Sequence, residues 1–190
     1  MRINAGQWKG RTLLSVKGMN TRPTSDMVKQ AIFNILQGQI QDKAFLDLYA
    51  GTGSIAFEAL SRGARSAILV EKDRAAVDVI RKNAEYLGCR DSVRVMANDV
   101  LYAAKLLSGR KFDIIFLDPP YGMNLELPTL EAVLENGLLR KSGIVIVQYT
   151  AEKHYSFEVP QELTEYDTRK YGKTALKFFA LAEERNEEQI

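Results

Sequence analysis

Hydrophobic and polar positions follow two alternating rhythms along most of this 190-residue chain. Short apolar runs that end in polar residues or glycine predict buried strands, and apolar residues spaced three or four apart predict helices. The predicted strands are 45–49, 67–70, 93–97, 112–117 and 143–148, and the predicted helices are 26–36, 55–61, 74–87, 100–107 and 129–135. Alternation of strand and helix at this spacing predicts an α/β fold, with a parallel sheet covered by helices on both faces.

The pattern differs at the two ends of the chain. Leu163–Tyr171 and Thr174–Leu181 flank a short turn, which predicts a terminal hairpin that adds an antiparallel strand to the sheet. Near the N-terminus, glycines punctuate short apolar pairs, which is typical of a β-hairpin or arm. We therefore expect an N-terminal arm over residues 1–22, one α/β domain over 23–182 and a charged tail over 183–190.

Composition narrows the class of protein. The chain is 46% hydrophobic and 26% charged with a net charge of +2, and its longest apolar runs are far shorter than a membrane span. No apolar leader follows Met1, so we expect a cytoplasmic protein. A single cysteine, Cys89, and a single histidine, His154, exclude an internal disulfide and argue against zinc hydrolase and Ser-His-Asp chemistry. We expect no metal.

Charge is distributed unevenly along the chain. Residues 1–25 contain five basic residues and no acidic one, whereas the C-terminal tail is acidic. This asymmetry favours a polyanionic partner for the arm, although a solvated basic face would have the same composition. Trp8 lies among the basic residues and could stack on a base or could anchor the arm to the core. The candidate RNA-binding residues are Arg2, Trp8, Lys9, Arg11 and Lys17.

The segment Phe112–Tyr121, FDIIFLDPPY, joins a buried strand to a carboxylate, two prolines and an aromatic ring. Pro119 and Pro120 cannot donate ladder hydrogen bonds, so the strand must stop before them. Pro119 also pushes Asp118 toward an extended conformation. The result is a stiff ledge of hydrogen-bond acceptors beside the ring of Tyr121, which suits a planar group that carries an NH2.

Other predicted strands also end in residues that could hold a ligand. In an open α/β sheet, ligands bind outside the carboxyl ends of the strands, where the strand order reverses. The chemistry-bearing residues at these ends are Asp47 with Gly51 and Gly53, then Glu71, Asp99 and Asp118.

The loop Gly51–Ala56 also satisfies the G-x-G-x-x-A dinucleotide pattern, with Glu71 about twenty residues later. A nicotinamide or flavin protein is therefore an alternative. Asp47 argues against it, because a carboxylate at this position suits an ammonium group and would lie poorly beside a pyrophosphate. The ledge at Asp118 argues against it as well, since hydride transfer does not require such acceptors.

S-adenosylmethionine has an ammonium group, a ribose and an adenine that match these positions. Gly51 and Gly53 allow the backbone to approach the methionine portion because no Cβ intervenes. We expect Glu71 to accept the ribose hydroxyls and Asp99 to accept the adenine amine. Asp99 could equally be a helix N-cap, and the two roles are compatible.

The run of motifs resembles the seven-stranded, Rossmann-like methyltransferases that use S-adenosylmethionine, and DPPY at 118–121 resembles the signature of those that methylate exocyclic amines of bases. A closer resemblance covers nearly the whole chain. The segments WKGR, RPTSDMVKQAIFNIL, FLDLYAGTGSIAFEALSRGA, VEKD, FLDPPY and RKYGKTALKFF are similar to bacterial small-subunit rRNA guanine-N2 methyltransferases of the RsmD type.

This resemblance implies the strand order 3-2-1-4-5-7-6, methylation of guanine 966 of 16S rRNA, and 16S rRNA or an assembling small subunit as the partner of a monomeric enzyme. It implies that Asp118, Pro119, Pro120 and Tyr121 form the catalytic ledge. The expected cofactor-binding residues are Asp47, Tyr49, Gly51, Gly53, Glu71, Lys72, Asn98 and Asp99, with Arg22 and Thr24 from the segment before the first helix. Methylation of another exocyclic amine, such as adenine N6, and a non-catalytic RNA-binding assembly factor stay open as alternatives.

Overall fold

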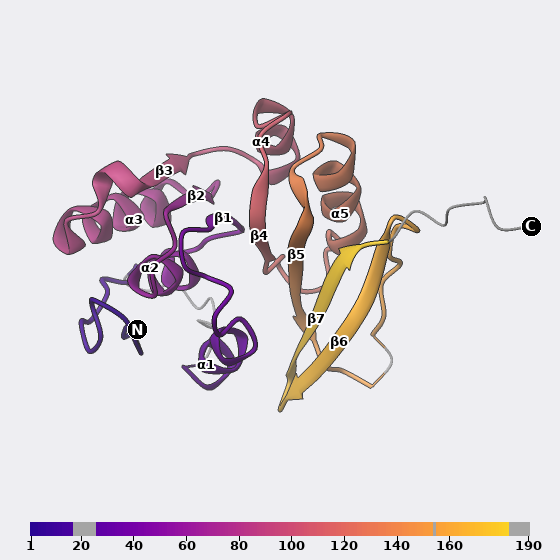
Figure 1. The fold of residues 1–190 in the computed structure, drawn as a ribbon, viewed down its shortest axis with the longest axis horizontal. Helices are drawn as coiled ribbons and strands as arrows, with labels where there is room; N and C mark the ends of the chain where they lie inside the picture. Colours follow the sequence, from indigo (N-terminus) through magenta and orange to yellow (C-terminus); the bar gives the residue numbers. More distant parts are fainter. Residues whose placement is uncertain (17–25, 154, 183–190) are drawn as a thin grey trace, which may run out of the picture.

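A seven-stranded sheet forms the centre of the computed structural model, which describes residues 1–16, 26–153 and 155–182 (Figure 1). Its strands lie in the order β3-β2-β1-β4-β5-β7-β6, as the resemblance implied. β7 is antiparallel to both of its neighbours, β5 and β6, and the other pairs are parallel. The strands are β1 Ala44–Leu48, β2 Ser66–Val70, β3 Val93–Met96, β4 Phe112–Leu117, β5 Leu139–Thr150, β6 Leu163–Tyr171 and β7 Thr174–Leu181.

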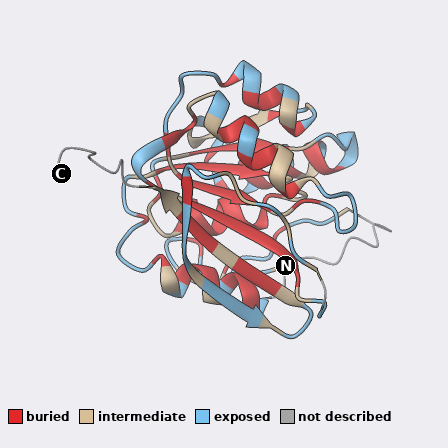
Figure 2. Cartoon of the chain, turned by 90° about the vertical axis from the view of Figure 1, so that its right-hand side faces the viewer, coloured by how far each residue is buried: buried red, intermediate tan, exposed pale blue. Residues whose placement is uncertain are grey.

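Helices cover both faces of the sheet, as the alternating pattern predicted. On one face α1, α2 and α3 pack in a core cluster with strand residues such as Phe45 and Phe116. On the other, α4 and α5 pack in a second cluster with Leu46 and Ile115. Figure 2 shows the buried residues concentrated in the central strands. The helices are α1 Asp26–Ile35, α2 Ser54–Ser61, α3 Arg74–Leu87, α4 Val100–Leu106 and α5 Glu126–Glu135, and a 3-10 turn spans Arg90–Ser92.

Local chemistry sets the ends of the helix that follows β2. Asp73 lies at the N-cap of α3, and its carboxylate accepts a hydrogen bond from the backbone N–H of Ala76 at 2.8 Å. Gly88 ends the helix in the left-handed conformation, with φ at 70°. Both ends agree with the prediction from the sequence.

Two predicted boundaries were wrong. α5 begins at Glu126, so Pro128 lies inside its first turn, where a missing N–H costs no helical hydrogen bond. β5 begins at Leu139 and not at Gly143, because the exposed residues 140–142 interrupt its apolar run. There its register with β4 shifts between Phe112 and Ile114. The 3-10 turn after α3 was not predicted.

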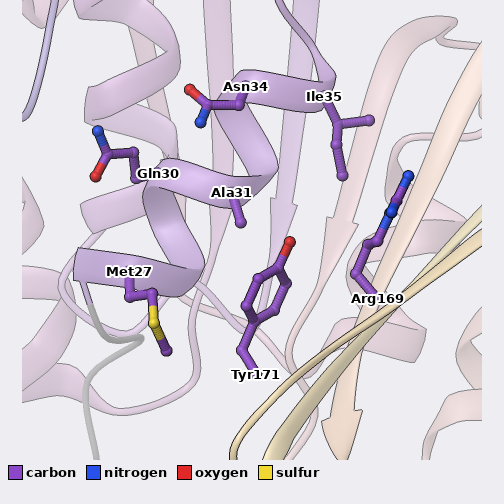
Figure 3. A pocket seen from close by; sticks show the side chains of 7 residues that line it. All are labelled: Met27, Gln30, Ala31, Asn34, Ile35, Arg169 and Tyr171. Carbon is purple, nitrogen blue, oxygen red and sulfur yellow. The ribbon is translucent and has the colours of Figure 1, made fainter.

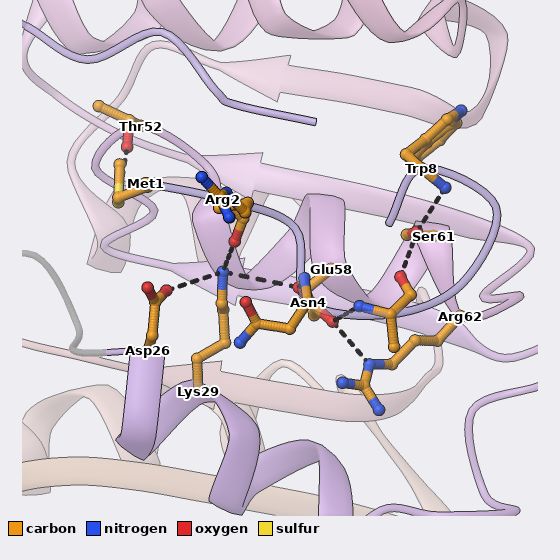
Figure 4. Close-up of polar contacts among 11 residues, drawn as sticks. Met1, Arg2, Asn4, Trp8, Asp26, Lys29, Thr52, Glu58, Ser61 and Arg62 are labelled. Carbon is orange, nitrogen blue, oxygen red and sulfur yellow. Dashed lines mark hydrogen bonds and ion pairs between the residues drawn. The ribbon is translucent and has the colours of Figure 1, made fainter. Parts of the chain in front are cut away.

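The N-terminal arm folds back on itself and packs against α2. A single antiparallel bridge joins Arg2 and Thr12, and Ile3 and Leu13 are buried in the first core cluster. The backbone N–H of Gln7 donates to the carbonyl of Ser61 at 2.8 Å, and that of Trp8 donates to the Ser61 hydroxyl at 3.0 Å (Figure 4). Within residues 1–16, the part of the arm that the structure describes, the predicted hairpin is therefore present as one bridge and a turn, without regular strands.

The described part of the chain can also be examined for membrane-spanning helices, clusters of metal ligands and disulfides. None of its helices combines the length and the apolar character that crossing a membrane requires. Its histidine, cysteine, aspartate and glutamate side chains form no group of three or more that could hold a metal ion. Cys89 is buried and is not part of a disulfide.

Candidate functional site

The strand register brings the predicted residues to one edge of the sheet. Leu48 is paired with Val70 of β2 and with Leu117 of β4, so these three strands end at the same level. Glu71 and Asp118 directly follow those ends, and the backbone N–H of Asp118 donates to the carbonyl of Leu48 at 3.4 Å. The carboxyl edge of the sheet therefore gathers acids that lie far apart in the sequence.

Asp47 is the most deeply buried of these acids, with 1% of its surface exposed. Its Oδ2 accepts a hydrogen bond from the backbone N–H of Ala56, in the first turn of α2, at 3.2 Å. Burial raises the pKa of Asp47 well above its ordinary value; the Ala56 hydrogen bond opposes this, and the charges of Asp118 and Glu71 add to it. The neighbouring charges of Asp118 and Glu71 thus disfavour ionisation of Asp47.

Glu71 is held by the backbone on both sides. Its Oε2 accepts a hydrogen bond from the N–H of Gly51 and its Oε1 accepts one from the N–H of Asp73, each at 2.8 Å. The first bond joins the glycine loop after β1 to the end of β2. Glu71 is half-buried, so its position is fixed while part of the carboxylate still faces solvent.

The two glycines of the loop differ in what surrounds them. A Cβ on Gly53, at φ 80°, would come within 2.7 Å of the Phe57 ring and 2.8 Å of Leu69, so packing requires a glycine there. A Cβ on Gly51, at φ 54°, would meet nothing within 4 Å. The loop therefore leaves open space over Gly51, next to the Glu71 carboxylate.

Tyr49 connects the end of β1 to α5. Its backbone has a positive φ of 68°, and its hydroxyl lies 2.7 Å from Oγ1 of Thr129. Burial raises the pKa of Tyr49. Sequence reasoning missed Thr129, because a threonine inside a predicted helix gives no sign of a partner 80 residues away.

Asp99 lies at the N-cap of α4, where its Oδ1 accepts a hydrogen bond from the N–H of Leu101 at 2.9 Å. This is the capping role left open by the sequence. It uses one carboxylate oxygen, so binding of an adenine amine stays a prediction. Asn98 is half-buried, and Lys72 is exposed beside Glu71.

The strand ends before the two prolines, as the sequence predicted. β4 ends at Leu117, Asp118 is half-buried, Pro119 is buried and Pro120 is exposed. Tyr121 is 48% exposed, so its ring can meet a ligand. The backbone carbonyls of this segment follow a strand end, where they can accept hydrogen bonds from outside the sheet.

A second set of polar groups that the sequence did not suggest lies at the start of α5. Glu126 is 1% exposed, and its Oε1 accepts a hydrogen bond from the hydroxyl of Tyr155 at 2.6 Å. Burial raises the pKa of Tyr155, and the bond to Glu126 raises it further. The charge of Glu126 also contributes to the raised pKa of Tyr49, so this pair borders the carboxyl edge.

The structure buries one of the candidate RNA-binding residues and leaves three others exposed. Trp8 is 9% exposed and belongs to the first core cluster, which favours the anchoring role and leaves its ring unsuited to stacking on a base. Arg2, Lys9 and Arg11 are exposed, and the Arg11 guanidinium lies 5.7 Å from the centroid of the Tyr86 ring. Lys17, Arg22 and Thr24 lie outside the described residues.

The whole arrangement favours a positively charged ligand with hydroxyl or amine groups. A cation near Asp47 would offset the repulsion that Glu71 and Asp118 exert on its carboxylate. The open space over Gly51 permits close approach to the backbone. S-adenosylmethionine, with its sulfonium and ammonium charges, fits these carboxylates. The residues that could hold it are those that the sequence indicated at the strand ends.

Comparison with known proteins gives a consistent result. Residues 1–180 match the family model described as conserved hypothetical protein 95. The chain is 34% identical over 155 residues to ribosomal RNA small subunit methyltransferase D of Haemophilus influenzae, covering 80% of each. It is 34% identical over 184 residues to YlbH of Bacillus subtilis, covering 94% of this chain and 98% of that one. The solved structure of yhhF from Escherichia coli has a TM-score of 0.85 and 32% identity, covering 95% and 97%.

Proposed function

Because this chain belongs to the RsmD/YlbH family of S-adenosylmethionine-dependent rRNA methyltransferases, we propose that it methylates the exocyclic N2 of a guanine in small-subunit rRNA, guanine 966 in the standard 16S numbering. The observation that carries the proposal is the acceptor ledge Asp118–Tyr121, which follows β4 at the edge where Asp47 and Glu71 also lie. The name of the Haemophilus relative specifies the small subunit, whereas the name of YlbH specifies rRNA alone.

The ledge supports attack by an aromatic amine. The lone pair of guanine N2 is delocalised into the ring, which makes the amine a weak nucleophile. Hydrogen bonds from its two N–H groups to the Asp118 carboxylate and the Pro119 carbonyl would favour a pyramidal nitrogen whose lone pair points away from the ledge. Asp118 would also stabilise the positive charge that develops on the nitrogen.

The reaction balances without a further reagent. S-adenosylmethionine supplies an electrophilic methyl group. The N2 lone pair forms the new N–C bond, the electrons of the C–S bond remain on sulfur, and N2 loses one proton to Asp118 or to water. The exposed ring of Tyr121 would stack on the target base, which must leave its own stack to reach the ledge.

We assign cofactor binding to the residues at and after the carboxyl ends of β1 and β2. Asp47, near the Gly51 loop, would face the methionine end, and Glu71 would accept the ribose hydroxyls. The raised pKa of Asp47 supports this, because the arrival of a cation would compensate its buried charge.

The deciding experiment is a methyl-transfer assay with isotopically labelled S-adenosylmethionine. Naked 16S rRNA, small-subunit particles, duplex DNA and a protein mixture are offered in parallel, and the labelled base is mapped by mass spectrometry. We expect label in N2-methylguanine of 16S rRNA. Label in N6-methyladenine or in protein would replace the proposed substrate, and no transfer to any of the four would support a non-catalytic role.

A further inference from the structure

A groove of about 330 Å³ lies between helix α1 and the end of strand β6, outside the candidate site described above (Figure 3). Figure 3 shows the ring of Tyr171 pointing up toward the helix, with Met27 and Gln30 on one side and Arg169 on the other. The groove is lined by Met27, Gln30, Ala31, Asn34, Ile35, Arg169 and Tyr171.

The sheet register places one end of this groove at the same edge as the candidate site. Thr150, the last residue of β5, is paired with Thr174, and Thr174 is paired with Tyr171 across the tip of the β6–β7 hairpin. The N–H of Ala151 donates to the carbonyl of Lys173 at 3.0 Å, which ties that tip to the end of β5.

The distance from the groove to the ledge is short enough for one ligand to reach both. β4 and β6 are separated by β5 and β7, so Tyr171 lies three strand spacings, about 14 Å, across the sheet from Asp118. A segment of RNA whose base is held at the ledge would therefore pass near Tyr171 within a few nucleotides.

The lining combines the groups that proteins use on unpaired nucleotides. Gln30 and Asn34 are exposed, lie four residues apart on the same side of α1, and both line the groove. Their amides point away from Tyr171 in Figure 3, so contact with a bound base requires these exposed side chains to rotate. Amide side chains can donate to and accept from base edges, and a tyrosine ring offers a stacking surface. Half-buried Tyr171 packs against the first core cluster, which holds its ring in place.

The charges around the groove favour a polyanion. Arg169, Lys170 and Lys173 are exposed at the hairpin tip. Asp167 lies 3.0 Å from Nε of Arg169 and offsets its charge, so Lys170 and Lys173 supply the net positive charge of the tip. Asp26 lies 3.6 Å from Nζ of Lys29. Phosphates that follow a stacked base would meet the cations of the tip.

We propose that the groove between α1 and β6 binds the single-stranded nucleotides that flank the target base, with Tyr171 stacking on one base and Gln30 and Asn34 contacting its edge. The inference rests on the proposed function for the identity of the RNA. It assigns a role to the segment RKYGK, residues 169–173, which the transfer reaction itself does not use.

The test measures binding separately from transfer. Two fluorescein-labelled fragments of 16S rRNA are used, one with guanine 966 flanked by unpaired nucleotides, and one cut back so that those flanking nucleotides are missing. Affinity is measured by anisotropy with S-adenosylhomocysteine present. We expect Tyr171→Leu to weaken binding of the longer fragment roughly tenfold, the scale of one base stacked on an aromatic ring, and to leave the shorter one unchanged. Tyr171→Phe keeps the ring and should bind like the wild type.

Two further variants guard against a folding defect. Gln30→Ala/Asn34→Ala changes only exposed helix positions to a good helix former and should also weaken the longer fragment selectively. Tyr166→Leu, at a 50% exposed tyrosine on the same strand outside the groove lining, is the matched control and should bind both fragments normally. Equal loss on both fragments, or no loss from either groove variant, overturns the inference.

The outcomes also separate this inference from the proposed function. One outcome is that the wild-type protein transfers no methyl group while the groove variants still bind the longer fragment more weakly. That result would support RNA binding in the groove and contradict the proposed methyltransferase activity. If the groove variants methylate N2 and bind both fragments normally, the proposed activity is supported and RNA binding in the groove is contradicted.

Discussion

At the scale of single residues, the carboxyl edge of the sheet is organised by acids with different surroundings. Asp47 is buried and has a raised pKa, Glu71 is fixed by two backbone N–H groups, and Asp118 lies half-buried on the ledge. These differences predict separate roles, in which Asp47 and Glu71 bind the cofactor and Asp118 orients the acceptor amine.

The first prediction separates the two roles by mutation. Asp118→Ala should abolish methyl transfer while binding of S-adenosylmethionine stays close to wild type, because the change is on the acceptor side. Glu71→Ala should weaken cofactor binding by about 1–3 kcal/mol, the scale for hydrogen bonds to a charged group. Isothermal calorimetry and the labelled-methyl assay measure the two effects. Near-normal turnover by Asp118→Ala would remove its assigned role.

The second prediction follows from the pKa of Asp47. A raised pKa means that the folded protein binds a proton more tightly than the unfolded chain, so this residue lowers stability as pH rises from about 4 through the folded pKa. Asp47→Asn should therefore raise the melting temperature above the folded pKa and lose that advantage at lower pH. It should also weaken S-adenosylmethionine binding, since the negative charge is gone. Thermal unfolding of both proteins across a pH series tests this. A difference in melting temperature between Asp47→Asn and the wild type that does not vary with pH would contradict the prediction.

At the scale of elements, one acid holds the N-terminal arm and two helices together. Glu58 of α2 is fully buried, and its carboxylate accepts hydrogen bonds from the N–H groups of Asn4 and Ala5 in the arm at 2.7 and 3.0 Å. It lies 3.5 Å from Nζ of the buried Lys29 of α1 and 2.8 Å from Nε of Arg62. Figure 4 shows these groups converging, with Lys29 also bonded to the carbonyl of Arg2.

The third prediction tests this junction. Glu58→Ala leaves Lys29 buried without its nearest buried anion and removes two acceptors from the arm, so we expect a loss of about 3–5 kcal/mol in the free energy of unfolding. Urea unfolding measures it. Asp78→Ala, which breaks the exposed pair with Arg81, is the control and should cost under about 1 kcal/mol.

A double variant shows whether charge is the cause. Lys29→Met/Glu58→Leu removes both buried charges together, so it should be more stable than Glu58→Ala alone. A double variant that is no more stable than the single one would mean that the missing hydrogen bonds to the arm dominate.

At the scale of the whole molecule, two sets of exposed basic side chains lie on the N-terminal arm and at the tip of the β6–β7 hairpin. Arg2, Lys9 and Arg11 are exposed on the arm, which packs on α2, and Arg169, Lys170 and Lys173 are exposed at the tip of the β6–β7 hairpin. The arm belongs to the same face of the sheet as α1, whose groove leads to that tip. The turn of the arm contacts Ser61 at the end of α2, away from the carboxyl edge, so only a long polyanion that extends over this face could contact both sets.

The fourth prediction concerns the arm. Lys9→Ala/Arg11→Ala should lower the affinity for 16S rRNA and make it less dependent on salt, by about 0.7 in the logarithmic slope for each phosphate that the arm no longer neutralises. Titrations at several salt concentrations measure this. Lys141→Ala, an exposed position near the opposite end of β5, should leave the slope unchanged. An unchanged slope in the arm variant would mean that the arm is only structural.

The sequence by itself determined the elements of this protein and the residue types of the candidate site. Strand and helix periodicities lie within one segment, as does the strand stop before Pro119, so these could be predicted locally and were confirmed within a few residues. The expectation that acids after several strands meet at one edge needed only the rule that parallel strands share an edge. The strand order came from the family resemblance, and the periodicity alone did not contain it.

The tertiary structure decided whatever depends on partners far apart in the chain. Trp8 could be an RNA contact or an anchor, and only packing against the core favours the anchor. Likewise, Tyr49 meets Thr129, and Glu58 meets the arm across more than 50 residues. Burial and mutual repulsion raise the pKa of Asp47, and both require the folded sheet. Such contacts leave no periodic signal in the sequence, because their energy depends on long-range geometry and not on local pattern.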